Sequence, residues 1–537
     1  MTNRANVLIL IVCCLFLYFI GSASINLTDP DEVFYTGTAK EMLANNSLLT
    51  PLIFGKPQFE KPPLFYWLLM ASFKIFGINT FAARLVPALI GMMGVLGTYF
   101  FMRKISGAPA SFYAALFLSA AFLYFGLSKT VITDIVFSVF TAFTLYAFYL
   151  WYRSRKDAYI VLFMVFLSLA VLTKGPLAIA LSFAAMVPFL FLSWNAKALR
   201  EFILNRYWLI FLVLGCGWFI YAFVKYGNGF AWEFFVRDNW HRLIYAEHRH
   251  SDTWYFYPAV IIGGMAPWTA YLLFLGKGFK KYRNEYLFLA SWIVSAFIIF
   301  TCAHSKLASY ILPLFPALCC ALAVSVDSMP GKSKLLIAAG VVNILFGAAG
   351  LIASPFIAKE CPSLAKPLFL SLLLLFLFMA AGGISLMKGK IKQAMFLNIA
   401  ALAAFLLGGV SSVPAKLETA FSDHDMPGIV REYGYEGKPI LCEKMFVRGV
   451  YFYTGNPVLV MNMGGKSPFW SSHPLDVLST EAEVKTFFSD KDKVLCVLTG
   501  EGREKIDGFF GGVRKNTVVS SNLDRVVVLS EKASSLK

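Results

Sequence analysis

Residues 134–152, DIVFSVFTAFTLYAFYLWY, begin with a single charged side chain, Asp134, and continue as a predominantly apolar run. A run of about 20 apolar residues is long enough to cross the hydrocarbon core of a bilayer as an α-helix. Such runs recur near residues 7–25, 80–102, 109–127, 134–152, 158–173, 176–194, 207–225, 257–276, 285–303, 307–326, 335–357, 367–387 and 393–413. We therefore predict a polytopic α-helical membrane protein with about thirteen transmembrane helices.

Composition and charge support this class of protein. Hydrophobic residues make up 58% of the 537-residue chain and charged residues only 15%. The mean hydropathy of +0.66 excludes a water-soluble globule for most of its length. The net charge of +17 comes largely from alternate short loops, at 103–104, 153–156, 197–206, 277–283, 332–334 and 388–392. The positive-inside rule makes these loops cytoplasmic. This predicts a cytoplasmic N-terminus and an outer C-terminal tail, and the basic charge does not indicate nucleic-acid binding.

A polar segment follows the first apolar run. Asp29 fits a helix N-cap, with Pro30 at the first helical position and Glu32 at the third, as in a capping box. We expect a helix from residue 30 to about residue 45, in which Asp31 is not needed for capping and lies one turn before Tyr35. Ionisable groups at a bilayer surface are costly and usually serve chemistry. Asp31 is therefore a candidate catalytic residue.

A second helix is expected to start at Pro62-Pro63 and to run through Met70. It is short and aromatic, so we predict that this amphipathic juxtamembrane helix lies in the plane of the interface. Glu60 and Lys61 precede its N-terminus, where backbone N–H groups also favour an anion.

An outer segment at 226–257 combines aromatic residues with arginines and histidines. The aromatic residues predict a position at the headgroup level, and Arg242 or Arg249 could bind a phosphate. Lipid headgroups and neighbouring carboxylates are alternative partners for both arginines. The histidines at 241, 248 and 250 lack a spacing specific for metal ligands. We assign no metal ligand and no cofactor, although the sequence is compatible with a divalent cation.

The tail beyond about residue 415 has a higher charge density and short β-branched runs. We predict strands at 439–442, 457–460, 493–498 and 524–529, with helices at 426–433 and 481–489. This alternation indicates a small α/β domain, and we divide the chain into a membrane domain, 1–413, and an outer domain, 414–537. A disulfide between Cys442 and Cys496 is permitted on an oxidising face.

Several polar residues interrupt the apolar background at the outer helix ends. Asp134 opens one span, Lys174 occupies a tight turn, and Lys306 and Tyr310 end another turn. A helix-start carboxylate and a snorkelling lysine are the alternative interpretations of Asp134 and Lys174. Together with the earlier candidates, these residues would gather on one side at one depth. Cations there would hold a lipid-borne phosphate, and carboxylates would act on sugar hydroxyls and any proton.

The order of these motifs resembles a known family. It comprises Asp-Glu after the first span, then Phe59-Glu60-Lys61-Pro62-Pro63, Thr133-Asp134, Leu172-Thr173-Lys174-Gly175-Pro176, the Arg/His-rich loop, and Ser-Lys-Leu-x-x-Tyr-x-Leu-Pro at 305–313. Over residues 1–413 this order is similar to that of the bacterial aminoarabinose lipid A transferases. Those enzymes are relatives of protein O-mannosyltransferases among the GT-C membrane glycosyltransferases.

The resemblance implies a polyprenyl-phosphate sugar donor, most simply undecaprenyl, used on the periplasmic face of the bacterial inner membrane. It implies that Asp31 is the first-loop catalytic aspartate, Lys61 a phosphate-binding lysine and Asp134 a second cavity carboxylate, with Arg242 and Arg249 competing to bind the lipid phosphate. We add Glu60 to the catalytic set, and we expect substrate contacts from the remaining candidates, Tyr35, Lys174, Lys306 and Tyr310.

The expected reaction is direct displacement at the anomeric carbon with inversion of configuration. Lipid A is the expected acceptor, and a protein, an O-antigen or another cell-wall glycan is the alternative. A lipid or sugar transporter is a further alternative, but many transporters carry internal repeats, and none is evident in this sequence. The expected partners are the lipid-linked donor, the acceptor and membrane lipids, and the pattern is compatible with a monomer.

Overall fold

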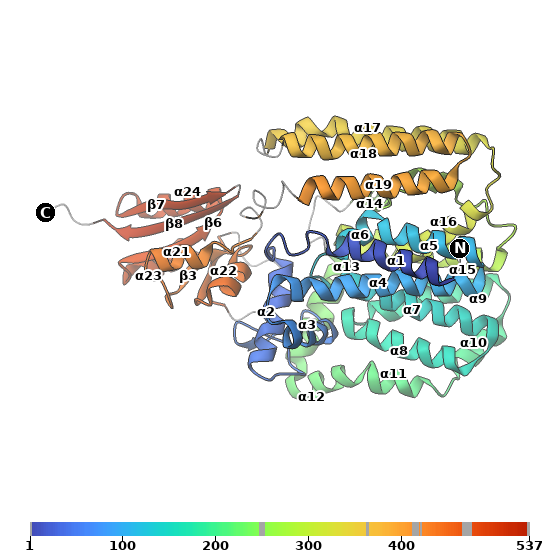
Figure 1. Ribbon diagram of the computed structural model, residues 1–537. Helices are drawn as coiled ribbons and strands as arrows, with labels where there is room; N and C mark the ends of the chain where they lie inside the picture. Colours follow the sequence, from blue (N-terminus) through green and yellow to red (C-terminus); the bar gives the residue numbers. More distant parts are fainter. Residues whose placement is uncertain are drawn as a thin grey trace.

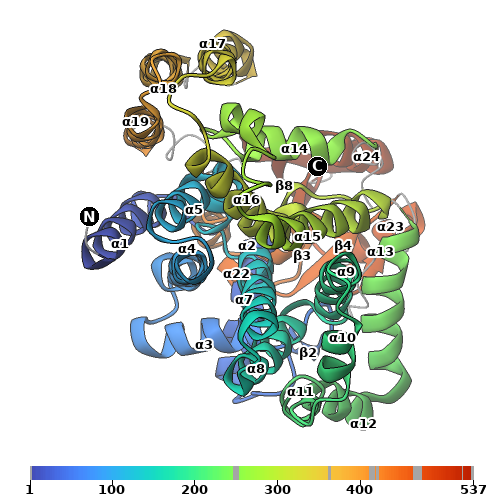
Figure 2. The ribbon, with the colours of Figure 1, turned by 90° about the vertical axis from the view of Figure 1, so that its right-hand side faces the viewer.

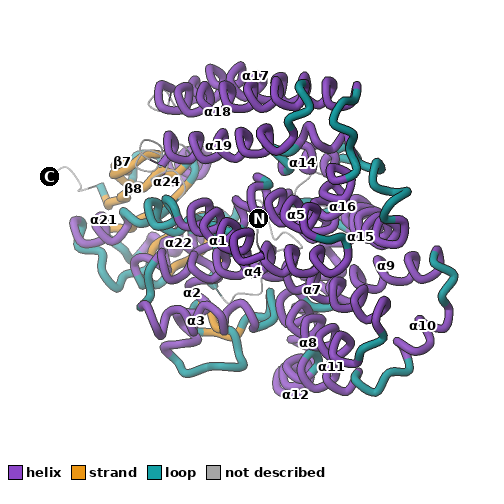
Figure 3. The backbone as a smooth tube through the Cα atoms, turned by 45° about the vertical axis from the view of Figure 1, so that its right-hand side comes forward, coloured by secondary structure: helices purple, strands orange, loops and turns teal. Residues whose placement is uncertain are grey.

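The computed structural model describes residues 3–245, 253–360, 365–410, 418, 422–463, 475–522 and 524–533. Its helices run roughly parallel in one large bundle, and a sheet domain formed by the C-terminal part of the chain lies beyond one end of that bundle (Figure 1). Figure 3 shows that strands are confined to this domain, apart from one short hairpin near α3.

Among the described residues, eight helices are long and apolar enough to cross a membrane. They are α4 (Thr80–Ile105), α7 (Thr133–Ser154), α8 (Asp157–Lys174), α15 (Arg283–Cys302), η4 with α16 (Ala308–Asp327), α17 (Lys334–Glu360), α18 (Ala365–Met387) and α19 (Ile391–Val410). A ninth is obtained if α11 (Trp208–Leu214) and the segment Gly217–His241, which comprises α12 (Gly217–Ala231) and η1 (Trp232–His241), form one span bent by 40°. The prediction of a polytopic helical membrane protein is confirmed.

The other four predicted apolar runs contain shorter or interrupted helices. They correspond to α1 (Asn3–Phe19), α5 (Ala108–Ala120) with α6 (Phe122–Leu127), α9 (Leu177–Leu192), and α14 (Phe256–Gly264) with η3 (Thr269–Phe274). The α5–α6 break has a clear local cause, since Ala121 is extended, with φ −63° and ψ 122°. Two further helices, α10 (Ala196–Ile203) and α13 (Arg242–Ile244), are short.

Small residues allow the helices to pack closely, as is usual in membranes. At Gly94 of α4, an added Cβ would collide with the hydroxyl of Tyr124, and that hydroxyl donates to the carbonyl of Gly91 at 2.8 Å. Helices α17, α18 and α19 form a group at the edge of the bundle (Figure 2). The buried amides of Asn343 and Asn398 bond to each other, and Asn398 also donates to the carbonyl of Pro267 at 3.1 Å. These bonds tie the group to the rest of the bundle.

The two helices predicted after the first apolar run are present, as α2 (Asp31–Ala44) and α3 (Leu64–Phe76). The hairpin β1 (Leu52–Ile53) and β2 (Lys56–Pro57) lies between them.

The predicted capping box at α2 is wrong. Pro30 occupies the N-cap position without a side-chain cap. The Glu32 carboxylate instead accepts from the backbone N–H and hydroxyl of Thr28 and from the guanidinium of Arg84. Asp29 is directed to the C-terminal domain, where its carboxyl lies beside that of Asp423. A buried arginine competes more strongly for Glu32 than a helix terminus does.

The described residues of the C-terminal domain form a six-stranded mixed sheet in the order β5-β4-β3-β6-β8-β7. The strands are β3 (Ile440–Glu443), β4 (Val458–Met461), β5 (Val477–Leu478), β6 (Lys493–Leu498), β7 (Arg514–Asn522) and β8 (Arg525–Lys532), and the helices are α21 (Met426–Glu432), α22 (Val447–Thr454), α23 (Glu481–Ser489) and α24 (Gly500–Phe510). All the strands and helices predicted in the tail are therefore present. The boundary predicted at 413/414 lies outside the described residues.

Cys442 and Cys496 are both free thiols, so the disulfide that the sequence permits is not formed. They lie on neighbouring parallel strands, where Leu441 rather than Cys442 is the partner of Cys496. Successive strand residues point to opposite faces, and the two cysteines belong to the hydrophobic clusters on either side of the sheet. No rotation of the side chains would bring the two sulfurs together through the sheet.

Several contacts hold the C-terminal domain against the bundle. The hydroxyl of Tyr453 donates to the carbonyl of Leu27 at 2.9 Å, and Arg448 bonds to Glu60 at 2.9 Å. Aromatic rings also meet there, with the Phe54 and Tyr451 centroids 4.7 Å apart. The domain is thereby fixed over the end of the bundle at which α2 and α3 begin.

Candidate active site

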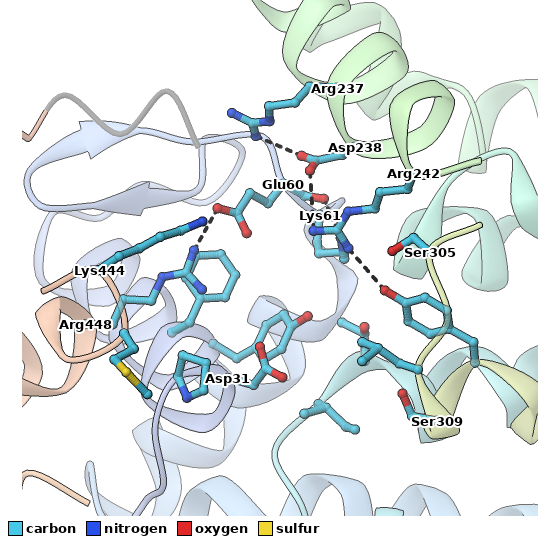
Figure 4. A pocket seen from close by; sticks show the side chains of 18 of the residues that line it. Asp31, Glu60, Lys61, Arg237, Asp238, Arg242, Ser305, Ser309, Lys444 and Arg448 are labelled. Carbon is cyan, nitrogen blue, oxygen red and sulfur yellow. Dashed lines mark hydrogen bonds and ion pairs between the residues drawn. The ribbon is translucent and has the colours of Figure 1, made fainter. Parts of the chain in front are cut away.

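A cavity of about 840 Å³ lies between this end of the bundle and the C-terminal domain. Its lining comes from α2, the segment before α3, the start of α7, the end of α8, η1, the segment before η4, and several turns of the sheet domain. Figure 4 shows charged side chains from both parts of the molecule converging there. A cavity of this size, partly apolar with a few convergent polar groups, is typical of a ligand site.

Asp31 and Lys61 lie on neighbouring parts of this lining. Asp31 occupies the first turn of α2, and burial raises the pKa of its carboxyl while Arg448 opposes that rise. Lys61 donates from Nζ to the carbonyl of Glu60 at 2.9 Å. Burial, helped by the like charge of Arg242, lowers the pKa of Lys61 to about 8. The pKa of the Asp31 carboxyl and the pKa of the Lys61 ammonium are therefore closer to each other than those of the same groups in water.

A second carboxylate lies at the start of α7. Asp134 accepts an ion-paired hydrogen bond from Lys174 at 2.7 Å, and both side chains are largely buried. Helices α7 and α8 pack side by side, so the first turn of one meets the last residue of the other. Gly175, with φ 76°, ends α8 directly after Lys174. The ammonium also lies 4.9 Å from the centre of the Tyr310 ring.

Arg242 approaches the cavity from the end of η1. Its guanidinium donates to the hydroxyl of Tyr310 at 3.3 Å and lies 3.8 Å from a carboxylate oxygen of Asp238. Asp238 also pairs with Arg237 at 2.8 Å. These contacts hold Arg242 beside Lys61, as Figure 4 shows. Two cations are therefore directed to one place, which suits the binding of a phosphate.

The structure brings together eight of the ten predicted site residues. The cavity is lined by Asp31, Tyr35, Glu60, Lys61, Asp134, Lys174, Arg242 and Tyr310. Lys306 is not among the lining residues: it is buried, and its ammonium donates to the carbonyl of Thr253 at 3.4 Å. Arg249 lies outside the described residues. Within the described ranges, no cluster of three histidine, cysteine, aspartate or glutamate residues is arranged to hold a metal ion.

The sequence predicted that the C-terminal domain shapes or covers the site, but it did not identify Lys444 and Arg448 as the basic residues that this domain contributes. Arg448 donates to a carboxylate oxygen of Glu60 at 2.9 Å and lies over the Phe34 ring, 4.1 Å from its centre. Lys444 also lines the cavity. The only local signal was a pair of basic residues just after the predicted strand at 439–442. These basic residues indicate a contribution to the site only once the position of the C-terminal domain over the end of the helical bundle is known.

Comparison with known proteins gives a consistent result. The model of the dolichyl-phosphate-mannose-protein mannosyltransferase family matches residues 60–221. An uncharacterized protein of Aquifex aeolicus is 30% identical over 315 residues, 58% of this chain and 71% of its own length. An undecaprenyl phosphate-alpha-4-amino-4-deoxy-L-arabinose arabinosyl transferase of Edwardsiella ictaluri is 26% identical over 357 residues, 64% of this chain and 63% of its own. The alignments with this enzyme and with a second Aquifex aeolicus protein span less than two thirds of the relatives, 63% and 62%.

Among solved structures, ArnT from Cupriavidus metallidurans bound to undecaprenyl phosphate superposes with a TM-score of 0.81. The alignment covers 100% of this chain and 99% of that one at 22% identity. At this identity the likeness shows the fold.

The fold and the family match together define the class, a polytopic membrane protein with the fold of ArnT and a region that matches the dolichyl-phosphate-mannose-protein mannosyltransferase model. The chain belongs to the dolichyl-phosphate-mannose-protein mannosyltransferase family, and its fold is that of ArnT. The resemblance inferred from the sequence motifs is confirmed.

Proposed function

We propose that this protein transfers a sugar of the aminoarabinose type from an undecaprenyl-phosphate donor to a phosphate of lipid A. The single observation that carries the proposal is the cavity in which Asp31, Lys61 and Arg242 converge with the Asp134–Lys174 pair. Support for the donor and acceptor comes from the arabinosyl transferases at 26–27% identity, which match 63–78% of their own lengths. The solved relative bound to undecaprenyl phosphate agrees with this donor.

We further propose a topology of thirteen spans with a cytoplasmic N-terminus. The positive-inside distribution of lysine and arginine supports this orientation. The four shorter or broken helices would complete the count beyond the eight or nine long ones. The membrane domain, 1–413, and the sheet domain, 414–537, would then enclose the cavity on the periplasmic face of the bacterial inner membrane.

In the proposed mechanism, Lys61, Lys174 and Arg242 are the donor-side cations. They stabilise negative charge on the polyprenyl phosphate as it leaves the anomeric carbon. Tyr310, whose hydroxyl accepts from Arg242 and whose ring faces the ammonium of Lys174, keeps these groups oriented. The bond to the leaving phosphate breaks as the acceptor oxygen bonds to the opposite face of the sugar, so configuration is inverted.

Asp31 would orient the sugar or the acceptor on the face opposite the leaving group. A phosphate acceptor is already anionic and needs no base, whereas a hydroxyl acceptor would give its proton to Asp31. Asp134 is paired with Lys174, so we assign it a positioning role within the donor-side set. Glu60 and Tyr35 line the same region and would contact the sugar.

Mass spectrometry of lipid A tests the proposal. Lipid A would be compared from cells with and without the protein, in a host that makes undecaprenyl-linked aminoarabinose. We expect an added aminopentose mass on a lipid A phosphate only when the protein is present. Unchanged lipid A with the protein inserted in the membrane would contradict the acceptor and would direct attention to periplasmic proteins and glycans.

A further inference from the structure

We propose that Lys444 and Arg448 of the C-terminal domain form an anion subsite that binds the phosphate of the acceptor. These two residues are named here the acceptor-side cations. The inference rests on the proposed function, because it requires that an anionic acceptor enter the cavity.

The C-terminal domain directs the ligand-binding edge of its sheet toward the cavity. Strand β3 pairs in parallel with both β4 and β6. From β3 the chain continues to β4 and β5 on one side of the sheet and then crosses to β6 on the other side, so the direction in which strands are added reverses beside β3. Glu443 ends β3, Met461 ends β4 and Thr499 follows β6, and all three line the cavity. Ligands of open parallel sheets bind outside the carboxyl ends of the strands at such a reversal. The cavity therefore lies where a domain of this topology would bind a ligand.

The acceptor-side cations sit at this edge. Lys444 follows β3 directly, and Arg448 lies in the first turn of α22. Figure 4 shows both side chains extending from the C-terminal domain toward Glu60. The guanidinium of Arg448 is held between the carboxylate of Glu60, at 2.9 Å, and the ring of Phe34, at 4.1 Å. A guanidinium fixed in this way loses little conformational freedom when it binds a phosphate.

The acceptor-side cations and Arg242 lie on different sides of the cavity. Figure 4 shows Lys444 and Arg448 on one side and Arg242 on the other. Arg448 and Lys61 both act electrostatically on Asp31, which places that carboxyl within reach of each set. In an inverting displacement the attacking and leaving groups occupy opposite faces of the sugar. With the leaving phosphate on the donor-side cations, the acceptor enters from the side of Lys444 and Arg448.

Charge balance also requires cations on the acceptor side. The carboxylates of Asp31, Glu60 and Glu443 line this region, and they would repel a phosphate acceptor. An ammonium and a guanidinium beside them offset that repulsion and offer charge-assisted hydrogen bonds. The same arrangement could also hold the donor phosphate, so the experiment must separate the two substrates.

The test measures steady-state kinetics of the full-length protein with each substrate varied in turn. Lys444→Gln and Arg448→Gln are compared with Lys485→Gln, an exposed cation of α23 that pairs with Glu481 and does not line the cavity. We expect each cavity variant to raise the KM for lipid A about ten-fold. The KM for the undecaprenyl-linked donor should stay within about two-fold of wild type.

The Lys485→Gln control should leave both values unchanged. Should Arg448→Gln lower the thermal stability, Lys444→Gln carries the test alone. An acceptor KM equal to that of the control in both cavity variants would overturn the subsite, and a rise in the donor KM instead would assign these cations to the donor phosphate. Wild-type protein that transfers no sugar to lipid A, while the donor is intact, would contradict the proposed function itself.

Discussion

The pKa of Lys61 predicts a basic limit to activity. The ammonium is the protonated form, so raising the pH through about 8 removes the charge that stabilises the leaving phosphate. With a pKa of about 8, roughly nine tenths of Lys61 is charged at pH 7 and roughly one tenth at pH 9. The kcat/KM for the donor should therefore fall about ten-fold between pH 7 and pH 9.

The assay is sugar transfer by purified protein at saturating acceptor, with donor concentration and pH varied. This ratio reports the ionisation of the free enzyme and of the free donor. The phosphodiester of the donor does not titrate in this range, and the amino group of an aminoarabinose donor titrates equally for the wild type and for every variant, so only a difference between proteins reports on Lys61. Lys61→Arg is the matched variant, because a guanidinium stays protonated well beyond pH 10. In Lys61→Arg the kcat/KM for the donor should no longer show the decline above pH 8 that Lys61 causes, here called the basic limb, even if the absolute rate changes.

The neighbouring charge provides a second perturbation. Arg242 lowers the pKa of Lys61 after burial does, so Arg242→Gln should move the basic limb to higher pH while weakening donor binding. A wild-type profile that stays flat to pH 10 would refute the assignment of Lys61. A basic limb that persists unchanged in Lys61→Arg would show that another group titrates.

Three further predictions concern stability and the joint between the two parts of the chain. Burial and then Asp423 raise the pKa of Asp29, so its contribution to stability is lost as the pH rises from about 4 through the raised value. Asp29→Asn should therefore raise the melting temperature at pH 8 more than at pH 5, and loss of stability at pH 8 would contradict this. Glu32→Gln breaks a buried pair with Arg84 at 2.5 Å and should cost about 3 kcal/mol in thermal unfolding. The exposed Glu201→Gln, which pairs with Arg155 at 3.2 Å, should cost under about 1 kcal/mol, and equal costs would refute the comparison. An added Cβ at Gly449 would collide with the carboxylates of Asp29 and Asp423, so Gly449→Ala should speed proteolytic release of the C-terminal domain, and an unchanged rate would count against a tight joint.

Local signals account for what the sequence predicted well. The length of the apolar runs predicted the membrane spans. Proline followed by aromatic residues predicted the starts of α2 and α3. Short β-branched runs located β3, β4, β6 and β8, because buried strands need such residues. The shorter β5 and the polar β7 carry a weaker pattern and were not predicted.

Contacts between distant segments account for what it missed. Glu32 was expected to cap a helix, but it is taken by Arg84, 52 positions along the chain. Arg448 reaches Glu60 across 388 positions, and no periodicity or spacing connects two such residues. Lys306 was predicted to belong to the site because it lies in the same outer turn as Tyr310. In the structure its ammonium instead donates to the carbonyl of Thr253. The sequence pattern predicts where a helix or strand lies. The partners of its side chains depend on how the helices and strands pack against one another.

Asp31 provides the most direct test of the central claim, that this cavity transfers a sugar from an undecaprenyl-phosphate donor. Wild-type protein and Asp31→Asn would be purified and shown to have the same melting temperature. Each would then be incubated with the labelled donor and lipid A. We expect label on lipid A with the wild-type protein, and transfer at least about a hundred-fold slower with Asp31→Asn, because the amide no longer orients the sugar or the acceptor as the carboxylate does. Full transfer by a folded Asp31→Asn protein, or none by the wild type, would contradict the claim.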